Sequence, residues 1–162
     1  MQMYTSKATS INGKCGKLPA IYRKINFPPG TSVLDVGCGD DSCIKIIKQN
    51  LDNSIKWKGY DPYNQPDSVN QKALNQEYDI CVCSNVLNVI DNTQSIKEII
   101  ELMVSKAKKI FITVYEGKGD GIGRQTGIDQ YQRNAKKSWY VDFINSLGFN
   151  ATCKSGIITI TN

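Results

Sequence analysis

The chain has 162 residues, a formal net charge of +5 and 40% hydrophobic residues, which suits one globular domain with a single core. It contains no histidine, so histidine general bases, Ser-His or Cys-His nucleophile pairs and histidine metal sites are excluded. The positive charge is modest and dispersed, so it permits an anionic partner without demanding nucleic acid. Acid–base chemistry must use Asp, Glu, Lys, Tyr, Cys or the substrate itself.

Six cysteines, at positions 15, 38, 43, 81, 83 and 153, raise the question of disulfides or a metal site. Their spacing argues against both, because no C-x-x-C pair occurs and two of them alternate along one face of an apolar run. No metal is therefore expected. The first residues contain no apolar signal segment, and no apolar run approaches the ~18 residues that span a bilayer. We expect a cytoplasmic protein, in the host cytoplasm if the chain is viral, with reduced thiols.

The first half of the chain alternates predicted strands and helices. A short apolar run over 32–36 predicts a buried strand, and apolar residues at helical spacing over 41–51 predict a helix. Residues 55–60 predict a weaker strand that ends at an Asp-Pro pair, because proline cannot continue a central ladder. We expect the polar stretch 64–77 to be a loop with at most one helical turn.

The middle of the chain continues this alternation. Residues 79–83 form an apolar run that predicts a strongly buried strand. Apolar residues at helical spacing over 95–106 predict a helix, capped by Asn92 or Thr93. Residues 109–115 then predict a further strand.

The last part contains a long glycine-rich stretch over 117–136, which we expect to be a loop too long for mere connection. A helix is predicted over 138–147, closed by Gly148, and 150–153 with 157–161 predict a hairpin. Alternating strands and helices indicate an α/β fold with a mostly parallel sheet and an antiparallel hairpin at its edge. We expect one domain spanning 1–162. Its ligand should lie beyond the carboxyl ends of the strands.

The segment that follows the first predicted strand is the richest in chemistry. Asp35 ends the strand, and Gly37 and Gly39 form a G-x-G turn before a helix, which brings backbone N–H groups close to a ligand. A dinucleotide site would favour a third glycine near Ser42 and no acid beside the phosphates. A carboxylate at this turn suits a cationic or zwitterionic ligand with an amino group. The alternative is an ordinary tight turn between strand and helix.

A second acid, Asp61, ends the next predicted strand about 20 residues beyond the glycine turn, where such acids hydrogen-bond ribose hydroxyls. Its alternative is a solvated turn residue of the Asp-Pro pair. Pro62 and Tyr63 follow, and either side chain suits contact with a flat base.

Three segments together resemble the class I S-adenosylmethionine-dependent methyltransferases: VLDVGCG at 33–39, GYDP at 59–62 and YDICVCSNVLNVI at 78–90. The resemblance covers roughly residues 31–115. It implies S-adenosylmethionine as cofactor and a Rossmann-like three-layer αβα sandwich. The cofactor-binding residues that it implies, together with the two candidates for the base, are Asp35, Gly37, Cys38, Gly39, Asp61, Pro62, Tyr63, Ser84, Asn85 and Val86.

The chain also departs from that family. Only about 17 residues separate Asp61 from the strand at 79, so we expect the family's third strand to be missing from its sheet order 3-2-1-4-5-7-6. Asp67 or Asn70 would then be left to contact the adenine. Residues 117–131, and more faintly those around Lys14, resemble methyltransferases associated with DNA phosphorothioation and small phage relatives. The N-terminal 1–30 is expected to act as a cap segment.

The resemblance implies direct in-line methyl transfer to an unidentified acceptor, either a small molecule or a nucleic acid. Candidate residues for removing a proton are Asp120, Tyr131 and Tyr4, and candidates for binding an anionic acceptor are Lys14, Arg124 and Arg133. Each of these can equally be a solvated loop residue. A second copy of the chain is a further candidate partner, and a membrane is not. Two other functions stay open, an enzyme that degrades S-adenosylmethionine, as lyase or hydrolase, and a non-catalytic module that binds it.

Overall fold

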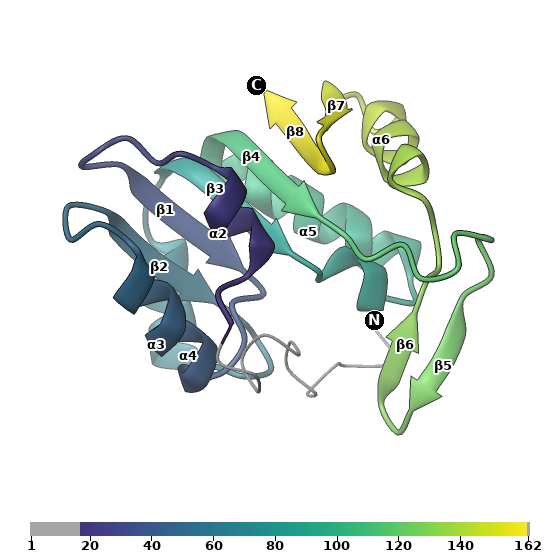
Figure 1. Ribbon diagram of the computed structural model, residues 1–162, viewed down its shortest axis with the longest axis horizontal. Helices are drawn as coiled ribbons and strands as arrows, with labels where there is room; N and C mark the ends of the chain where they lie inside the picture. Colours follow the sequence, from purple (N-terminus) through teal and green to yellow (C-terminus); the bar gives the residue numbers. More distant parts are fainter. Residues whose placement is uncertain (1–16, 162) are drawn as a thin grey trace.

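The computed structural model describes residues 17–161, so Tyr4 and Lys14 lie outside the described residues. A six-stranded sheet in the order β2-β1-β3-β4-β8-β7 forms the centre of the molecule (Figure 1). Its strands are β1 (Ser32–Val36), β2 (Lys56–Tyr60), β3 (Tyr78–Ser84), β4 (Ala107–Thr113), β7 (Ala151–Lys154) and β8 (Ile157–Thr161). β2, β1, β3 and β4 run parallel, whereas β8 pairs antiparallel with β4 and β7 pairs antiparallel with β8. This confirms the predicted sheet, including its C-terminal hairpin and its missing third strand.

Helices cover both faces of the sheet, which confirms three layers. They are α2 (Ala20–Lys24), α3 (Asp41–Asn50), α4 (Asp67–Leu74), α5 (Thr93–Lys106) and α6 (Lys137–Ser146), with a 3-10 turn η1 (Leu87–Val89). Figure 1 shows α2 in front of the sheet and α5 behind it. Alternate strand residues point to opposite faces, so β3 places Ile80 and Val82 in the core beneath α2 and α3. It places Cys81 and Cys83 in the core beneath α5 and α6.

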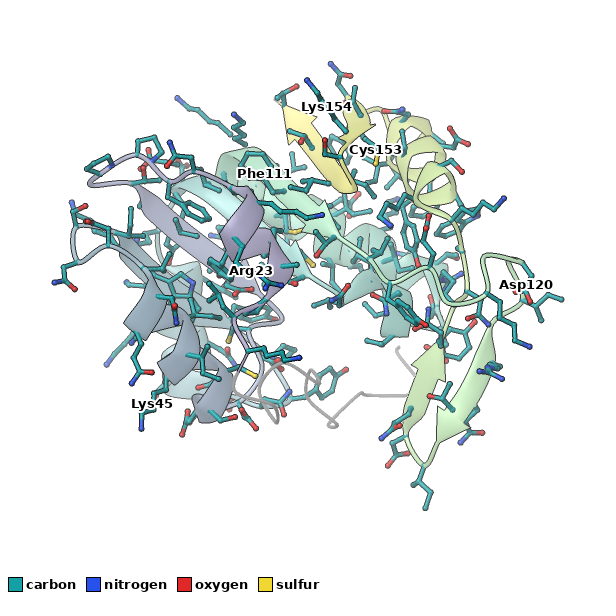
Figure 2. The ribbon with its side chains drawn as sticks, viewed as in Figure 1. Arg23, Lys45, Phe111, Asp120, Cys153 and Lys154 are labelled. Carbon is teal, nitrogen blue, oxygen red and sulfur yellow. The ribbon has the colours of Figure 1, made fainter. Side chains whose placement is uncertain are left out.

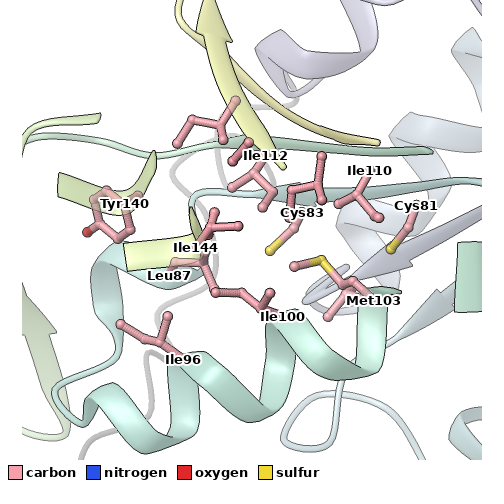
Figure 3. Close-up of a cluster of buried hydrophobic side chains, with 14 of the residues drawn as sticks. Cys81, Cys83, Leu87, Ile96, Ile100, Met103, Ile110, Ile112, Tyr140 and Ile144 are labelled. Atoms are coloured by element: carbon pink, nitrogen blue, oxygen red, sulfur yellow. The ribbon is translucent and has the colours of Figure 1, made fainter. Parts of the chain in front are cut away.

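The two strand cysteines, Cys81 and Cys83, are core residues. Both are fully buried, beside the Met103 and Ile100 side chains of α5 in the cluster of Figure 3. Burial raises the pKa of Cys83 well above its ordinary value, so the reactive thiolate is disfavoured.

Two predicted loops contain secondary structure instead. Residues 64–77 were expected to be a loop because of Pro66, yet α4 begins directly after this proline, where the missing N–H group breaks no helical hydrogen bond. The glycine-rich stretch contains β5 (Arg124–Gly127) and β6 (Gln130–Gln132), a separate two-stranded antiparallel sheet. Every residue of β5 is exposed, so the apolar alternation that marks a strand does not occur there.

The other predicted elements are confirmed with boundaries shifted by up to two residues. The Asn92 side chain accepts hydrogen bonds from the backbone N–H groups of Gln94 and Ser95, which caps α5 as expected. Helix α2 was not predicted and buries Ile21 and Tyr22 against the sheet. In the described part of the chain, every helix is too short or too polar to cross a bilayer.

Candidate functional site

A cleft of about 1060 Å³ opens at the carboxyl ends of β1, β2 and β3, where parallel α/β sheets bind their ligands. All ten predicted cofactor residues line it: Asp35, Gly37, Cys38, Gly39, Asp61, Pro62, Tyr63, Ser84, Asn85 and Val86. They come from three segments that follow three neighbouring strands. The parallel register therefore brings together residues that are up to 51 positions apart in the sequence.

The turn between β1 and α3 needs its glycines. Gly37 has a φ of +79°, and a Cβ atom there would lie 2.2 Å from Val86 Cγ2. The backbone therefore approaches the segment after β3 more closely than any side chain allows. The Gly37 N–H group donates to the Tyr60 carbonyl over 2.7 Å, and the Asp40 side chain caps α3 by accepting from two backbone N–H groups. The turn is thus held from both sides.

Asp35 is the most perturbed carboxylate of the cleft. Its side chain is 2% exposed and accepts a hydrogen bond from the Tyr22 hydroxyl, which in turn accepts one from the Trp57 indole over 2.8 Å. Among the described residues, none donates to its second oxygen, Oδ1. Burial raises the pKa of Asp35 to about 7, against the lowering effect of the Tyr22 hydrogen bond and with a smaller contribution from Asp61. Oδ1 is therefore a buried acceptor that lacks a donor.

Asp61 has the opposite character. Its Oδ1 accepts from the backbone N–H groups of Tyr63 and Asn64, over 3.0 and 3.1 Å. Its Oδ2 accepts from Gly39 N over 3.0 Å and from Asn64 Nδ2 over 3.1 Å. Four donors fill the usual capacity of a carboxylate. Of these four, only the Asn64 amide belongs to a side chain that can rotate away and admit another donor.

The segment after Asp61 is held by buried amides. Asn70 accepts from Asp61 N over 2.9 Å and donates to the Asp61 and Gln65 carbonyls. Gln65 donates to the Gly39 carbonyl over 2.9 Å, so this segment is tied to the glycine turn. Neither candidate for the adenine contact lines the cleft, because Asn70 is engaged with the backbone and Asp67 lies exposed at the start of α4.

The predicted catalytic and acceptor residues divide between the cleft and the surface. Tyr131 and Arg124, both on the β5–β6 hairpin, line the cleft. Asp120 is exposed at the outer edge of the molecule, where it accepts from the Ile122 N–H group (Figure 2). Arg133 does not line the cleft. Its guanidinium donates to the Ile90 and Asp91 carbonyls.

Sequence reasoning missed three functional candidates in and beneath the cleft wall. Asn88 and Gln132 are joined by a hydrogen bond of 3.1 Å between Asn88 Nδ2 and Gln132 Oε1, and Asn88 Oδ1 has no donor among the described residues. Tyr22 supports Asp35 from α2. No sequence pattern marks these residues, because their partners are distant in the chain.

The sequence matches no protein-family model, and no curated protein is similar to it. Solved structures are similar in fold. A Burkholderia thailandensis 1,6-didemethyltoxoflavin-N1-methyltransferase with bound 1,6-didemethyltoxoflavin and S-adenosylhomocysteine superposes with a TM-score of 0.63 at 13% identity, over 96% of this chain and 80% of that one. A cyclopropane-fatty-acyl-phospholipid synthase-like protein from Lactobacillus casei gives 0.58 at 11%, over 89% and 72%.

A third structure, the magnesium protoporphyrin IX methyltransferase of Synechocystis with bound S-adenosylmethionine, gives a TM-score of 0.51 at 16% identity, over 83% of this chain and 71% of that one. At these identities the likeness concerns the fold, which the chain shares with these three proteins.

Proposed function

We propose that this chain is an S-adenosylmethionine-dependent methyltransferase whose cofactor binds in the cleft. The observation that carries the proposal is the unpaired Asp35 Oδ1, a buried acceptor beside a glycine turn at the carboxyl end of β1. An ammonium group placed there supplies both the missing donor and the opposite charge. The amino-acid end of S-adenosylmethionine carries such a group, and the fold is shared with methyltransferases.

The remaining residues of the cleft suit the other parts of this cofactor. The Gly37–Gly39 turn lines the cleft together with Asp35 and is assigned to the methionine end. Asp61 is assigned to the ribose hydroxyls, which requires the Asn64 amide to give up its bond to Oδ2. Pro62 and Tyr63 lie next to this position, and Tyr63 is half exposed, with a ring face available for the base.

The sulfonium of the bound cofactor supplies an electrophilic methyl group, and the chain supplies geometry. Holding the acceptor in line with that methyl group converts a bimolecular reaction into a local one, which lowers the barrier by several kcal/mol. Tyr131 and Arg124 are the acceptor-side candidates that line the cleft. Tyr131 is assigned to accept or relay a proton and Arg124 to hold an anionic part of the acceptor. We assign Asp120 and Arg133 no role in the reaction.

A small molecule is the acceptor that we favour. The cleft of about 1060 Å³ lies at the upper end of the range for small-molecule pockets, about 300–1,000 Å³, which suits a small acceptor beside the cofactor. The Burkholderia thailandensis enzyme of the same fold holds a small acceptor beside S-adenosylhomocysteine.

Calorimetry and a labelled-methyl screen test the proposal. The protein should bind S-adenosylhomocysteine, and labelled methyl should appear in a small-molecule fraction of a cell extract. Absence of binding at ~1 mM, the weak end of specific affinities, would overturn the cofactor assignment. Consumption of S-adenosylmethionine without any acceptor would identify a degrading enzyme instead. Binding without transfer or consumption would identify a binding module.

A further inference from the structure

Two buried amide side chains, those of Asn88 and Gln132, form a hydrogen-bonded relay in the part of the cleft wall built by η1 and β6. Asn88 is 3% exposed, and its Nδ2 donates to Gln132 Oε1 over 3.1 Å. Gln132 Nε2 donates in turn to the Tyr115 carbonyl over 3.0 Å. The Arg133 N–H group donates to the Asn88 carbonyl over 2.8 Å, so the two backbones are tied at the same place. Asn88, Gln132 and Tyr115 all line the cleft.

The direction of this relay is fixed from its far end. A backbone carbonyl can only accept, so Gln132 must present its NH₂ group to Tyr115 and its oxygen to Asn88. Asn88 must then donate with Nδ2, which leaves Oδ1 as the atom without a partner. None of the described residues donates to Asn88 Oδ1. A buried acceptor without a donor is costly, and this one lies on a side chain of the cleft wall.

We propose that Asn88 Oδ1 accepts a hydrogen bond from the methyl acceptor, which therefore presents an N–H or O–H group at this position. The inference rests on the proposed methyltransferase function and narrows its substrate class. A carboxylate or phosphate oxygen placed against Asn88 Oδ1 would set two acceptors against each other. Amines, amides, ring N–H groups and hydroxyls fit this position, and an anionic oxygen does not.

The location of the relay assigns Asn88 to the acceptor and not to the cofactor. The proposed cofactor residues Asp35 and Asp61 follow β1 and β2, and Ser84, Asn85 and Val86 lie at the end of β3 or directly after it. Asn88 follows β3, and Gln132 belongs to the hairpin that forms its own small sheet. Tyr131, the neighbour of Gln132, lines the same part of the cleft. What distinguishes Asn88 from these cofactor residues is its side-chain bond to Gln132, which joins it to the β5–β6 hairpin that the proposed cofactor site does not use.

Matched pairs of small aromatic compounds test this inference. Saturation-transfer NMR would measure their binding to the protein saturated with S-adenosylhomocysteine. The pairs are indole with 1-methylindole, phenol with anisole, and benzamide with benzoate, so one member of each offers a donor that the other lacks. Wild type should favour the donor-bearing member by on the order of tenfold, the usual effect of satisfying one buried acceptor. Because the two members of a pair also differ in size or charge, the ratio of their affinities is compared between wild type and variants.

Asn88→Leu should abolish this preference while it keeps S-adenosylhomocysteine affinity within about threefold of wild type, a change below 1 kcal/mol. Gln132→Met removes the acceptor that fixes the orientation of the Asn88 amide but leaves Asn88 Oδ1 in place. This variant should reduce the preference in part. Asn50→Leu, an exposed amide on α3, is the matched control and should change neither measurement. If the Leu variant does not fold, as judged by circular dichroism, Asn88→Ala serves the same comparison.

Each outcome either supports or overturns the proposed hydrogen bond at Asn88 Oδ1. A preference that is absent in wild type, or that survives in the Asn88 variants, overturns the inference. A loss of S-adenosylhomocysteine affinity in these variants of more than about tenfold also overturns it, because Asn88 would then serve the cofactor. Failure of the wild-type protein to bind S-adenosylhomocysteine overturns the proposed function as well, so the two failures are distinguishable.

Discussion

Asp35→Asn should stabilise the protein alone and weaken its binding of S-adenosylhomocysteine. The two effects have one cause, the buried carboxylate of Asp35. Without a ligand, the ionised group has only the Tyr22 hydroxyl as a donor among the described residues, and its Oδ1 has none. With the ligand, the proposed ammonium group becomes its partner. The variant therefore separates the free energy of folding from the free energy of binding.

The size of the folding effect follows from the Asp35 pKa, which burial raises from 3.8 to about 7. Since one unit of pKa corresponds to about 1.4 kcal/mol, the ionised carboxylate costs the folded protein about 4 kcal/mol at pH 8. An Asn side chain avoids this cost but leaves its buried NH₂ group unpaired, at about 1–3 kcal/mol. The net gain at pH 8 is then about 1–3 kcal/mol, and the melting temperature should rise by about 2–4 °C for each kcal/mol.

The pH dependence gives the sign of the effect. Below pH 3.8 Asp35 is protonated in both the folded and the unfolded state, so its burial costs no ionisation energy. The cost appears as pH rises, because the unfolded state loses its proton first, and it is complete above about pH 7. The advantage of Asp35→Asn should therefore be largest at pH 8 and reverse towards pH 4, where only the cost of the unpaired Asn amide remains. Binding of S-adenosylhomocysteine to wild type should strengthen as pH rises through 7.

Thermal unfolding at pH 8 and pH 5, with calorimetry of S-adenosylhomocysteine, would measure both effects. Asp79→Asn is the matched control, because Asp79 is exposed and hydrogen bonds from Ser32 lower its pKa. That variant should lose a little stability at pH 8 and bind the ligand normally. An Asp35→Asn protein that melts below wild type at pH 8 would refute the burial argument. An unchanged affinity for S-adenosylhomocysteine would refute the contact with the ammonium group.

Three further variants test the site. Gly37→Ala should melt several degrees below Gly30→Ala and lose ligand binding. Both positions have a positive φ, but only the new Cβ at position 37 would meet another side chain, at 2.2 Å. Equal melting temperatures of the two variants would contradict the close approach of Gly37 to Val86. Asn64→Ala should tighten S-adenosylhomocysteine binding about two- to tenfold in calorimetry, because it removes one competing donor from Asp61. Weaker binding would show that Asn64 itself contacts the ligand. Arg133→Leu should lower the free energy of unfolding in urea by about 1–3 kcal/mol, because two backbone carbonyls lose their donor, and should leave ligand affinity unchanged.

The part of the cleft that we assign to the cofactor could be located from the sequence because its signals are local. An apolar run that ends in Asp35, glycines with positive φ and the Asp40 cap all lie within about ten consecutive residues. Each of them acts on the backbone of its own segment, so the order of strand, turn and helix follows from the sequence. The parallel arrangement of strands then brings Asp61 and Ser84 to the same edge without any further signal.

The acceptor side of the cleft could not be predicted in this way. The β5–β6 hairpin is exposed and polar, so its strands lack the apolar alternation that marks a buried face. Gln132 lies 44 residues from Asn88, and Tyr22 lies 13 residues from Asp35 on a five-residue helix. These pairs depend on tertiary packing, and an isolated Asn or Tyr in a sequence does not reveal its partner.

The unpaired buried atoms of the cleft describe the ligand that it fits. In the described part of the chain, three buried side-chain polar atoms lack a partner, and one of them, the Tyr140 hydroxyl, lies in the core away from the cleft. The other two, Asp35 Oδ1 and Asn88 Oδ1, are both acceptors and belong to residues that line the cleft. Because buried acceptors are nearly always satisfied, we expect the proposed ligands to bring a donor to each of these two oxygens. An ammonium group on the cofactor and an N–H or O–H group on the acceptor meet this requirement, whereas a pyrophosphate would add acceptors to both positions.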